Sequence, residues 1–214
     1  MTDQEILSHV DHTLLKADTG WPEIQKLCEE AIRYGAASVC IPPSYVKRAK
    51  DGFPSLNIGT VVGFPLGYST CEVKVVEAAQ AVANGAAEID MVANLGDVKN
   101  GDFDKVTAEI AALRKTIGHK TLKVIIETCY LTEDEKTALC RAVTGGGADY
   151  LKTSTGFGPA GAKIEDIRLF KKHLGAGVKI KAAGGIKTRE DMERFLGEGC
   201  DRIGSSSAIA VITA

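Results

Sequence analysis

Residues 178–185 read Val-Lys-Ile-Lys-Ala-Ala-Gly-Gly, and a helical pattern over Thr188–Leu196 follows them. This is a short strand-like run, a turn of small residues and an amphipathic helix. The same unit recurs along all 214 residues, and no linker, charge block or low-complexity segment divides the chain. The strand-like runs are His9–Leu14, Ala37–Ile41, Ile58–Phe64, Ala87–Ala93, Leu122–Thr128, Tyr150–Ser154, Lys179–Ala183 and Arg202–Ser205.

Helical patterns lie between these runs. Ser69 before Glu72, and Thr132 before Glu135, predict capping boxes at the start of two helices. Glycines that suit a helix C-terminus follow several helical stretches, namely Gly35, Gly85, Gly145 and Gly197. Examples of the expected helices are Ser69–Ala83, Phe103–Ile117, Thr132–Thr144, Lys163–His173 and Thr188–Leu196.

Eight strands that alternate with eight helices predict an α/β protein with a parallel sheet. At this length, a single (β/α)8 TIM barrel that spans residues 1–214 as one domain is the expected architecture. An open doubly wound sheet is the alternative. It is disfavoured because no G-x-G-x-x-G motif follows the first strand-like run.

Composition and charge exclude several classes of function. The chain is 44% hydrophobic and 25% charged, with a net charge of -2. It therefore has no basic footprint for nucleic acid or for an anionic membrane. No apolar run approaches the roughly 20 residues of a membrane span, and residues 1–5 lack the basic flank of a signal peptide. A cytoplasmic protein is expected.

The cysteines predict neither a disulfide framework nor a zinc site. The six are scattered, and none falls in a C-x-x-C pair. They are best interpreted as reduced core residues. Cys40 ends a strand-like run, where it would be either a reactive thiol at a pocket edge or, as we prefer, a buried inert thiol.

Charged residues unexpectedly alternate with apolar residues in several strand-like runs, although parallel strands are usually continuously apolar. A period of two places each such set on one face of its strand, so we expect these charges inside the barrel, where they must pair. Lys152, Lys181 and Asp90 would then be neighbours. The other charges in these runs are explained as well by structural ion pairs, and they are Glu88, Lys123, Glu127 and Lys179.

Lys152 and Lys181 are each followed by a turn of small residues. A lysine amine is a nucleophile only when it is neutral, and an ordinary lysine has a pKa of about 10.4. A second cation held nearby in a poorly solvated site lowers that pKa and frees the amine to attack a carbonyl. Two lysines converging on one pocket therefore indicate Schiff-base chemistry, whereas either one alone would more often be a structural residue.

Turns rich in glycine, serine and threonine follow the sixth, seventh and eighth runs. In a (β/α)8 barrel this is where the active site lies, and the turns after strands seven and eight commonly bind phosphate through backbone N–H groups. Tight turns that simply need glycine are the alternative. The candidate phosphate-binding residues are Thr155, Gly156, Gly184, Gly185, Gly204, Ser205 and Ser206.

Two carboxylates are candidates for proton transfer. Asp90 ends a charged stripe, and Asp11 lies in the first strand-like run, where an N-cap or turn role is the alternative. His9 and His12 would fall on opposite faces of a strand, and no third ligand has suitable spacing. We therefore expect no catalytic metal.

Six segments resemble, in order and spacing, those of the deoxyribose-phosphate aldolase family. The last two are the most specific, and together the six cover nearly the whole chain. They are Val10–Leu14, Val39–Ile41, Glu88–Val92, Lys123–Thr128, Lys152–Phe157 (KTSTGF) and Lys181–Ile186 (KAAGGI).

The resemblance implies a class I aldolase that works without metal or cofactor. It would cleave 2-deoxy-D-ribose 5-phosphate to D-glyceraldehyde 3-phosphate and acetaldehyde, as in deoxyribonucleotide catabolism. By family motif, Lys152 would form the Schiff base and Lys181 would be the second lysine. Asp90 would be the proton donor and acceptor, with Asp11 as its partner in a proton relay.

Two other functions fit the same barrel. One is a phosphosugar isomerase that transfers protons through carboxylates, and the other is a phosphosugar-binding barrel without catalysis. Trapping of acetaldehyde on a lysine by borohydride would separate the aldolase from both. The expected partners are a small phosphorylated sugar and aldehydes, with no nucleic acid and no membrane. The sequence does not fix the oligomeric state, for which a homodimer or a homotetramer is expected.

Overall fold

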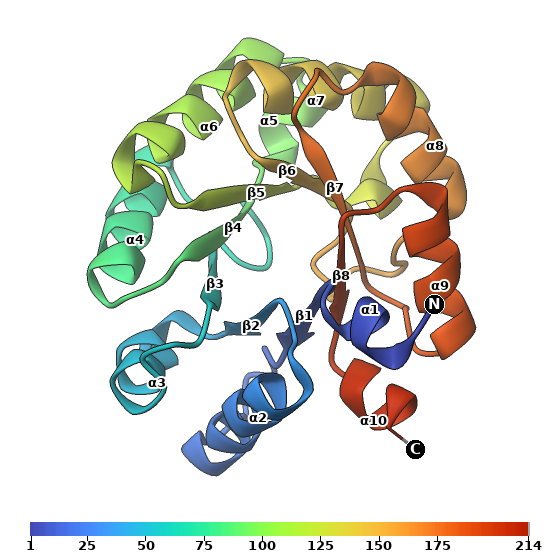
Figure 1. Cartoon of the computed structure of the whole chain (residues 1–214). Helices are drawn as coiled ribbons and strands as arrows, with labels where there is room; N and C mark the ends of the chain where they lie inside the picture. Colours follow the sequence, from blue (N-terminus) through green and yellow to red (C-terminus); the bar gives the residue numbers. More distant parts are fainter. Residues whose placement is uncertain (214) are drawn as a thin grey trace.

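The computed structural model describes residues 1–213, and it shows eight parallel strands closed into a barrel with helices around the outside (Figure 1). Each strand pairs with its neighbour in sequence, and β1 pairs with β8 to close the ring. The expected (β/α)8 TIM barrel is therefore confirmed. The strands are β1 (Val10–Thr13), β2 (Ser38–Ile41), β3 (Ile58–Val62), β4 (Glu88–Val92), β5 (Thr121–Ile125), β6 (Tyr150–Lys152), β7 (Lys179–Ala183) and β8 (Arg202–Ser205).

Helices occupy the segments between successive strands. Helix α1 precedes β1 and packs against α9 and α10, so the first and last helical segments lie together (Figure 1). Two short 3-10 helices, η1 (Pro43–Tyr45) and η2 (Thr128–Tyr130), follow β2 and β5. The α-helices are α1 (Asp3–Leu7), α2 (Trp21–Tyr34), α3 (Val46–Gly52), α4 (Cys71–Ala83), α5 (Leu95–Lys99), α6 (Phe103–Ile117), α7 (Glu133–Gly145), α8 (Ile164–His173), α9 (Arg189–Glu198) and α10 (Ala208–Ile212).

Two layers of side chains hold the barrel together. Ile89, Leu122 and Leu151 are fully buried and belong to the hydrophobic core that includes the inner faces of the surrounding helices. Residues of the other parity on the same strands face the barrel interior, so Asp90 and Lys123 are also buried there. The period of two thus separates an apolar layer from a charged one.

Some expected helix ends are confirmed and others are wrong. Thr132 caps α7 through a capping box, as expected. The capping box expected at Ser69 is wrong, because the N-cap position of α4 is Thr70, which makes no side-chain cap hydrogen bond. Helix α9 continues past Gly197 to Glu198, and its C-cap is Gly199, whose φ of 107° lies in the left-handed region that glycine adopts without strain.

Of the other expected glycine ends, Gly35 is confirmed, whereas Gly85 and Gly145 each lie one residue from the C-cap. Gly35 is a left-handed C-cap with a φ of 66°. Gly85 lies one residue beyond the C-cap Asn84, and Gly145 is the last residue of α7 rather than its cap. Each expected glycine thus lies within two residues of the observed C-cap, which is the usual precision of a helix end.

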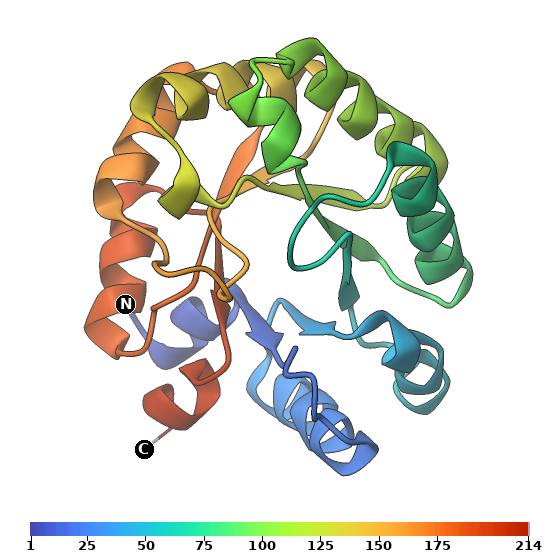
Figure 2. The same cartoon turned by 180° about the vertical axis from the view of Figure 1, so that it is seen from behind.

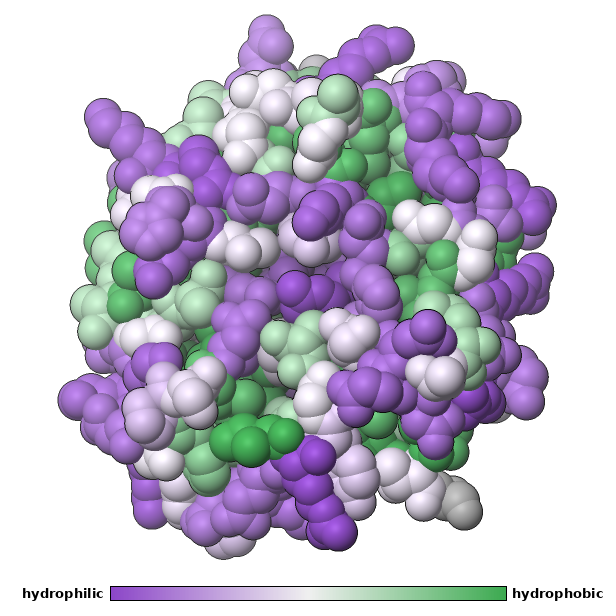
Figure 3. Space-filling model, in the orientation of Figure 1, coloured by the Kyte–Doolittle hydropathy of each residue, from purple (hydrophilic) through white to green (hydrophobic). Residues whose placement is uncertain are grey.

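Loops that follow the strands project over one end of the barrel. Figure 2 shows the segments between β3 and α4 and between β6 and α8 reaching over the ring of strands. The opposite face, seen in Figure 3, is mostly hydrophilic. Within residues 1–213, no helix is both long and apolar enough to cross a membrane.

Candidate active site

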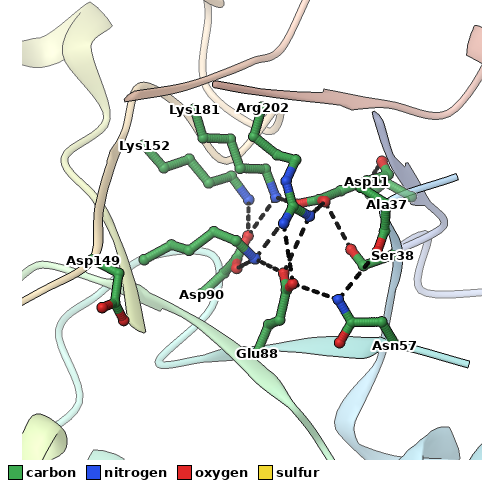
Figure 4. Close-up of polar contacts among 12 residues, drawn as sticks. Asp11, Ala37, Ser38, Asn57, Glu88, Asp90, Asp149, Lys152, Lys181 and Arg202 are labelled. Atoms are coloured by element: carbon green, nitrogen blue, oxygen red, sulfur yellow. Dashed lines mark hydrogen bonds and ion pairs between the residues drawn. The ribbon is translucent and has the colours of Figure 1, made fainter. Parts of the chain in front are cut away.

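Asp90 on β4 lies at the centre of a buried group of charges inside the barrel (Figure 4). Its Oδ2 accepts hydrogen bonds from Lys152 Nζ and Lys181 Nζ, both at 2.8 Å. Its Oδ1 accepts one from Lys123 Nζ, also at 2.8 Å. The register places Asp90 beside Lys123, and Lys152 beside Lys181, on neighbouring strands. The expected meeting of Lys152, Lys181 and Asp90 is therefore observed.

Asp11 on β1 is the second carboxylate of the group. It is fully buried and forms an ion pair with Lys181 Nζ at 2.5 Å. Ser38 Oγ donates a hydrogen bond of 2.7 Å to Asp11 Oδ1, and Arg202 Nη1 contacts the same oxygen. Asp11 thus bridges Lys181 to β8, which fits the expected place in a proton relay better than an N-cap.

Glu88 is the third carboxylate. It lies two residues before Asp90 on β4 and points to the same face of the strand. It pairs with Lys123, and its Oε1 lies 3.3 Å from Arg202 Nη2. Asn57 Nδ2 donates to Glu88 Oε1 at 2.6 Å. We call the seven ionisable residues of this group the barrel cluster: Asp11, Glu88, Asp90, Lys123, Lys152, Lys181 and Arg202.

The two lysines that share Asp90 Oδ2 differ in pKa. Burial lowers the pKa of Lys152, and the Lys181 cation adds to this effect, while Asp90 opposes it. Burial also acts to lower the pKa of Lys181, but Asp11 and Asp90 together raise it above its ordinary value. Lys152 is therefore the amine predisposed to be neutral, and Lys181 is the one held as a cation.

The carboxylates of the barrel cluster remain charged. Burial would raise the pKa of Asp90, but Lys123, Lys152 and Lys181 hold it well below its usual value. Burial acts in the same way on Asp11, whose pKa is lowered by Lys123, Lys181 and Arg202. Both groups are thus anions that stabilise nearby cations and accept hydrogen bonds.

A cavity of about 660 Å³ opens above the cluster at the strand C-termini. Lys152 lines it, together with all seven residues expected to bind phosphate. The cavity thus extends from a wall of small residues to the buried amine of Lys152. The seven are Thr155, Gly156, Gly184, Gly185, Gly204, Ser205 and Ser206.

At two of these positions the geometry explains why the residue is glycine, because a Cβ atom would contact a neighbouring residue closely. Gly184 has a φ of 83°, and a Cβ there would lie 3.1 Å from Gly161 Cα on a neighbouring loop. At Gly204, a Cβ would lie 3.2 Å from Lys181 Cε. Gly204 thus leaves room for the lysine as well as lining the cavity.

Ser205 and Ser206 differ in what their hydroxyls contact. Ser205 is buried, donates to the Ile186 carbonyl at 3.2 Å, and accepts from the Ser207 N–H at 3.2 Å. It therefore ties the two small-residue turns together. Ser206 is exposed at the cavity wall.

Several residues of the site were not predicted from the sequence. Lys16 and Lys187 line the cavity and add positive charge near the small-residue turns. Each lies three or four residues after the end of a strand, Lys16 after β1 and Lys187 after β7, and that position in the sequence is the signal that could have found them. Arg202 begins its strand with no alternating charge to point it out. It lies in the barrel cluster nonetheless.

Glu127 supports the loop after Lys152 from outside the barrel cluster. Its φ of 51° is in the left-handed region, which is uncommon for glutamate. Its carboxylate accepts hydrogen bonds from the Thr155 N–H at 3.2 Å and from the Thr155 hydroxyl. Beyond this, the Phe157 ring lies edge-on to the Phe64 ring at 5.3 Å, joining two loops at the barrel mouth.

One expected interior residue is not inside. Lys179 has the same parity as Lys181, but it begins β7 and is exposed. Its Nζ lies 5.7 Å from the centre of the Tyr150 ring. Parity fixes the face of a strand, whereas the depth along the barrel decides whether a side chain is enclosed.

Cys40 is buried, and burial raises the pKa of its thiol to about 11. This agrees with the interpretation of an inert cysteine. Among residues 1–213, no three histidine, cysteine or carboxylate side chains are grouped to hold a metal ion. That activity needs no metal stays a prediction.

Comparisons with known proteins agree with this geometry. A family model described as "DeoC/LacD family aldolase" matches residues 6–209. A deoxyribose-phosphate aldolase of Clostridium botulinum is 60% identical over 213 residues, which are 99% of this chain and 96% of that protein.

Solved structures give the same result. The structure of an aldolase called QR15 has a TM-score of 0.94 and 36% identity, over 98% of this chain and 95% of the other. A deoxyribose phosphate aldolase from Aeropyrum pernix, described as a unique tetrameric structure, has a TM-score of 0.89 and 28% identity over 99% and 91%. The chain therefore belongs to the DeoC/LacD family of aldolases.

Proposed function

We propose that this protein is a class I lyase that cleaves 2-deoxy-D-ribose 5-phosphate, reversibly, to D-glyceraldehyde 3-phosphate and acetaldehyde. The name of its relative from C. botulinum supports this substrate. The observation that carries the mechanism is the pair of buried lysines on one carboxylate oxygen of Asp90, with pKa values shifted in opposite directions.

Lys152 is the nucleophile. Its neutral amine attacks the C1 aldehyde of the ring-opened sugar, and loss of water gives a protonated imine bonded to Lys152. The lysine is buried yet lines the cavity, so the substrate carbonyl has access to it. The protonated imine is an electron sink for the next step.

Cleavage of the C2–C3 bond follows removal of the C3 hydroxyl proton. Asp90 receives that proton through water, and D-glyceraldehyde 3-phosphate leaves. The C2–C3 electron pair remains on the lysine-bound fragment as an enamine. Protonation of the enamine at C2 and hydrolysis then release acetaldehyde and return Lys152.

Lys181 and Asp11 act on these proton steps. Lys181 stays a cation between Asp11 and Asp90, at 2.5 and 2.8 Å. Its charge disfavours protonation of Lys152 and orients Asp90. Asp11 keeps Lys181 protonated and completes the relay.

The phosphate group would lie against the small-residue wall of the cavity. Backbone N–H groups of Gly184, Gly185 and Gly204 are the expected donors, with Thr155, Gly156, Ser205 and Ser206 beside them. Lys16 and Lys187 line the same cavity and supply charge that favours a phosphorylated substrate.

A homodimer or a homotetramer is proposed for the assembly. The relative from A. pernix is described as tetrameric. Light scattering on the purified protein measures the state directly, and a monomer would contradict the proposal. We also propose a cytoplasmic location, since all six cysteines of the described chain are free, as is usual in a reducing compartment.

Turnover decides between this function and its competitors. Purified protein incubated with 2-deoxy-D-ribose 5-phosphate should release acetaldehyde, and dialysis against a chelator should not reduce the rate. An isomerase would give a product of unchanged mass, and a binding protein would give none. Either result would overturn the proposal.

A further inference from the structure

The barrel cluster contains one more basic group than it has carboxylates. Within residues 1–213 it comprises three carboxylates and four basic side chains, all at least largely buried. If all seven were charged, the interior would carry a net charge of +1. A low-dielectric interior disfavours such an excess, and one neutral base removes it.

The contacts indicate which base is neutral. Lys123 lies within ion-pair distance of all three carboxylates. Lys181 contacts two of them, and Arg202 also contacts two. Lys152 contacts Asp90 alone and shares that oxygen with Lys181. Loss of charge on Lys152 therefore sacrifices the fewest ion pairs.

We propose that Arg202 and Glu88, which do not line the cavity, set the charge of Lys152 through the charge balance of the barrel cluster. The inference rests on the proposed function, in which neutral Lys152 is the nucleophile. Arg202 and Glu88 are positioning residues in this scheme, because they act on the nucleophile through Asp11, Lys123 and Asp90 and not on the substrate.

The two residues have opposite effects on the balance. Without Arg202, three carboxylates face only Lys123 and Lys181, so a proton on Lys152 restores neutrality. Without the Glu88 charge, two carboxylates face three cations, and a proton on Lys152 increases the excess. Removal of Arg202 should therefore favour the charged amine, and removal of the Glu88 charge should favour the neutral amine.

Lys16 and Lys187 line the same cavity as Lys152, but within residues 1–213 the ionisable groups that act on the Lys152 amine are those of the barrel cluster and Cys40. Lys152 faces Asp90 and Lys181, and Cys40 beyond them has a thiol pKa raised by burial to about 11. Strand β3 contributes no ionisable residue, since it reads Ile-Gly-Thr-Val-Val over residues 58–62.

The charged neighbours of Arg202 and Glu88 also belong to the barrel cluster. Arg202 faces Asp11 and Glu88, and its guanidinium carbon lies 5.8 Å from the Tyr150 ring centre. Glu88 faces Lys123 and Arg202, with the neutral Asn57 amide beside it. Burial would lower the pKa of Arg202, but Asp11 and Glu88 raise it, so it remains charged throughout the working range.

The size of the effect follows from geometry. Strands β4 and β8 each lie two positions from β6 in the ring. At about 4.8 Å per strand, a charge on either is roughly 10 Å from Lys152. With an effective dielectric of about 20, one charge at that distance shifts a pKa by about one unit.

The test is the pH dependence of imine formation on Lys152. The full-length protein is incubated with acetaldehyde and cyanoborohydride, and the initial rate of Lys152 labelling is measured by peptide mass spectrometry from pH 5 to 10. We compare the parent protein with Arg202→Met, Glu88→Gln and, as the charge-conserving control, Arg202→Lys. Circular dichroism establishes that each variant is folded.

We expect the midpoint of labelling to move in opposite directions. Arg202→Met should raise it by about one pH unit, Glu88→Gln should lower it by about one unit, and Arg202→Lys should keep it near the parent value. A merely structural role would reduce the amount of label without moving the two midpoints apart.

Shifts in the same direction, or none, with Lys152 still labelled would overturn the inference but leave the proposed function intact. Absence of label on Lys152 in the parent protein would overturn the proposed function itself. If Arg202→Met does not fold, Glu88→Gln decides, since its side chain has the same shape. A labelling midpoint that moves to lower pH in Glu88→Gln supports the inference, and a midpoint that does not move contradicts it.

Discussion

Two regions of this molecule bury lysines completely, and they do so in different ways. Lys74 on α4 lies outside the barrel, against Glu109 on α6 at 2.8 Å and the Val92 carbonyl at 2.9 Å. One cation there meets one carboxylate. In the barrel cluster, four basic groups share three carboxylates, and Lys152 has only part of one.

The difference shows that burial of a lysine does not by itself indicate chemistry. A buried cation with its own partner is a structural ion pair that would be costly to break. A buried amine left without a full partner is the one that loses its proton. The cavity meets Lys152 and does not reach Lys74, which gives the second requirement, access for a substrate.

Replacement of Lys152 should have the largest effect on activity. Lys152→Leu removes the proposed nucleophile, so we expect turnover of 2-deoxy-D-ribose 5-phosphate to fall by at least about 10⁴-fold. Acetaldehyde should no longer be trapped. A variant that keeps a tenth of the activity would show that the covalent step occurs elsewhere.

Replacement of Lys181 should have a smaller effect with a change in pH dependence. Lys181→Leu removes the cation that disfavours protonation of Lys152, so the pKa of Lys152 rises and less of it is neutral at pH 7. A rise of two to three units would cost about 10²- to 10³-fold in rate. The acid limb of the pH–rate profile should move to higher pH.

An unmoved profile in Lys181→Leu would contradict this electrostatic role. Lys181→Arg is the matched control for charge, and it should keep the acid limb closer to that of the parent protein. Its larger head group lies beside Gly204, so its maximal rate is expected to fall for steric reasons.

A substitution in the small-residue wall of the cavity, the proposed phosphate site, should change KM for the phosphorylated sugar. Ser206 is exposed at the cavity wall, so Ser206→Glu can introduce a negative charge there without burying it. That charge would repel the phosphate group of the substrate. We expect KM for the phosphorylated sugar to rise by about tenfold or more. Ser206→Ala and unphosphorylated 2-deoxyribose are the controls, and equal effects on both sugars would refute the assignment.

Replacement of Lys74 should have the smallest effect on catalysis and the clearest effect on stability. Lys74→Met leaves Glu109 buried without its cation, so we expect the free energy of unfolding to fall by about 3–5 kcal/mol. The double variant Lys74→Met/Glu109→Leu should recover most of it. A shift in the pH profile of Lys152 labelling would mean that the two regions are coupled, contrary to our comparison.

The sequence predicts the barrel well, because parity and turn residues act locally. All eight expected strand-like runs overlap a strand of the barrel. The alternation of side chains along each strand also brings Lys152, Lys181 and Asp90 together, because the inward-facing residues of all strands share the narrow interior of the barrel. The glycine-rich turns reach the cavity because they follow the strand C-termini.

What the sequence does not predict depends on distance along the barrel and on contacts between distant strands. Lys179 and Lys181 have the same parity, yet only Lys181 is enclosed. Arg202 pairs with Asp11, which is 191 positions away, and no local pattern indicates this. Glu127 acts from a left-handed backbone conformation that periodicity does not reveal.

We propose that the two lysines on one oxygen of Asp90 have different charges, with Lys152 neutral and Lys181 protonated. The most direct measurement is to treat the protein with acetaldehyde and borohydride at pH 7, digest it, and locate the reduced ethyl adduct by mass spectrometry. We expect the adduct on Lys152 and an unmodified Lys181. An adduct on Lys181 would reverse the two roles, and no adduct on either lysine would contradict the Schiff-base mechanism.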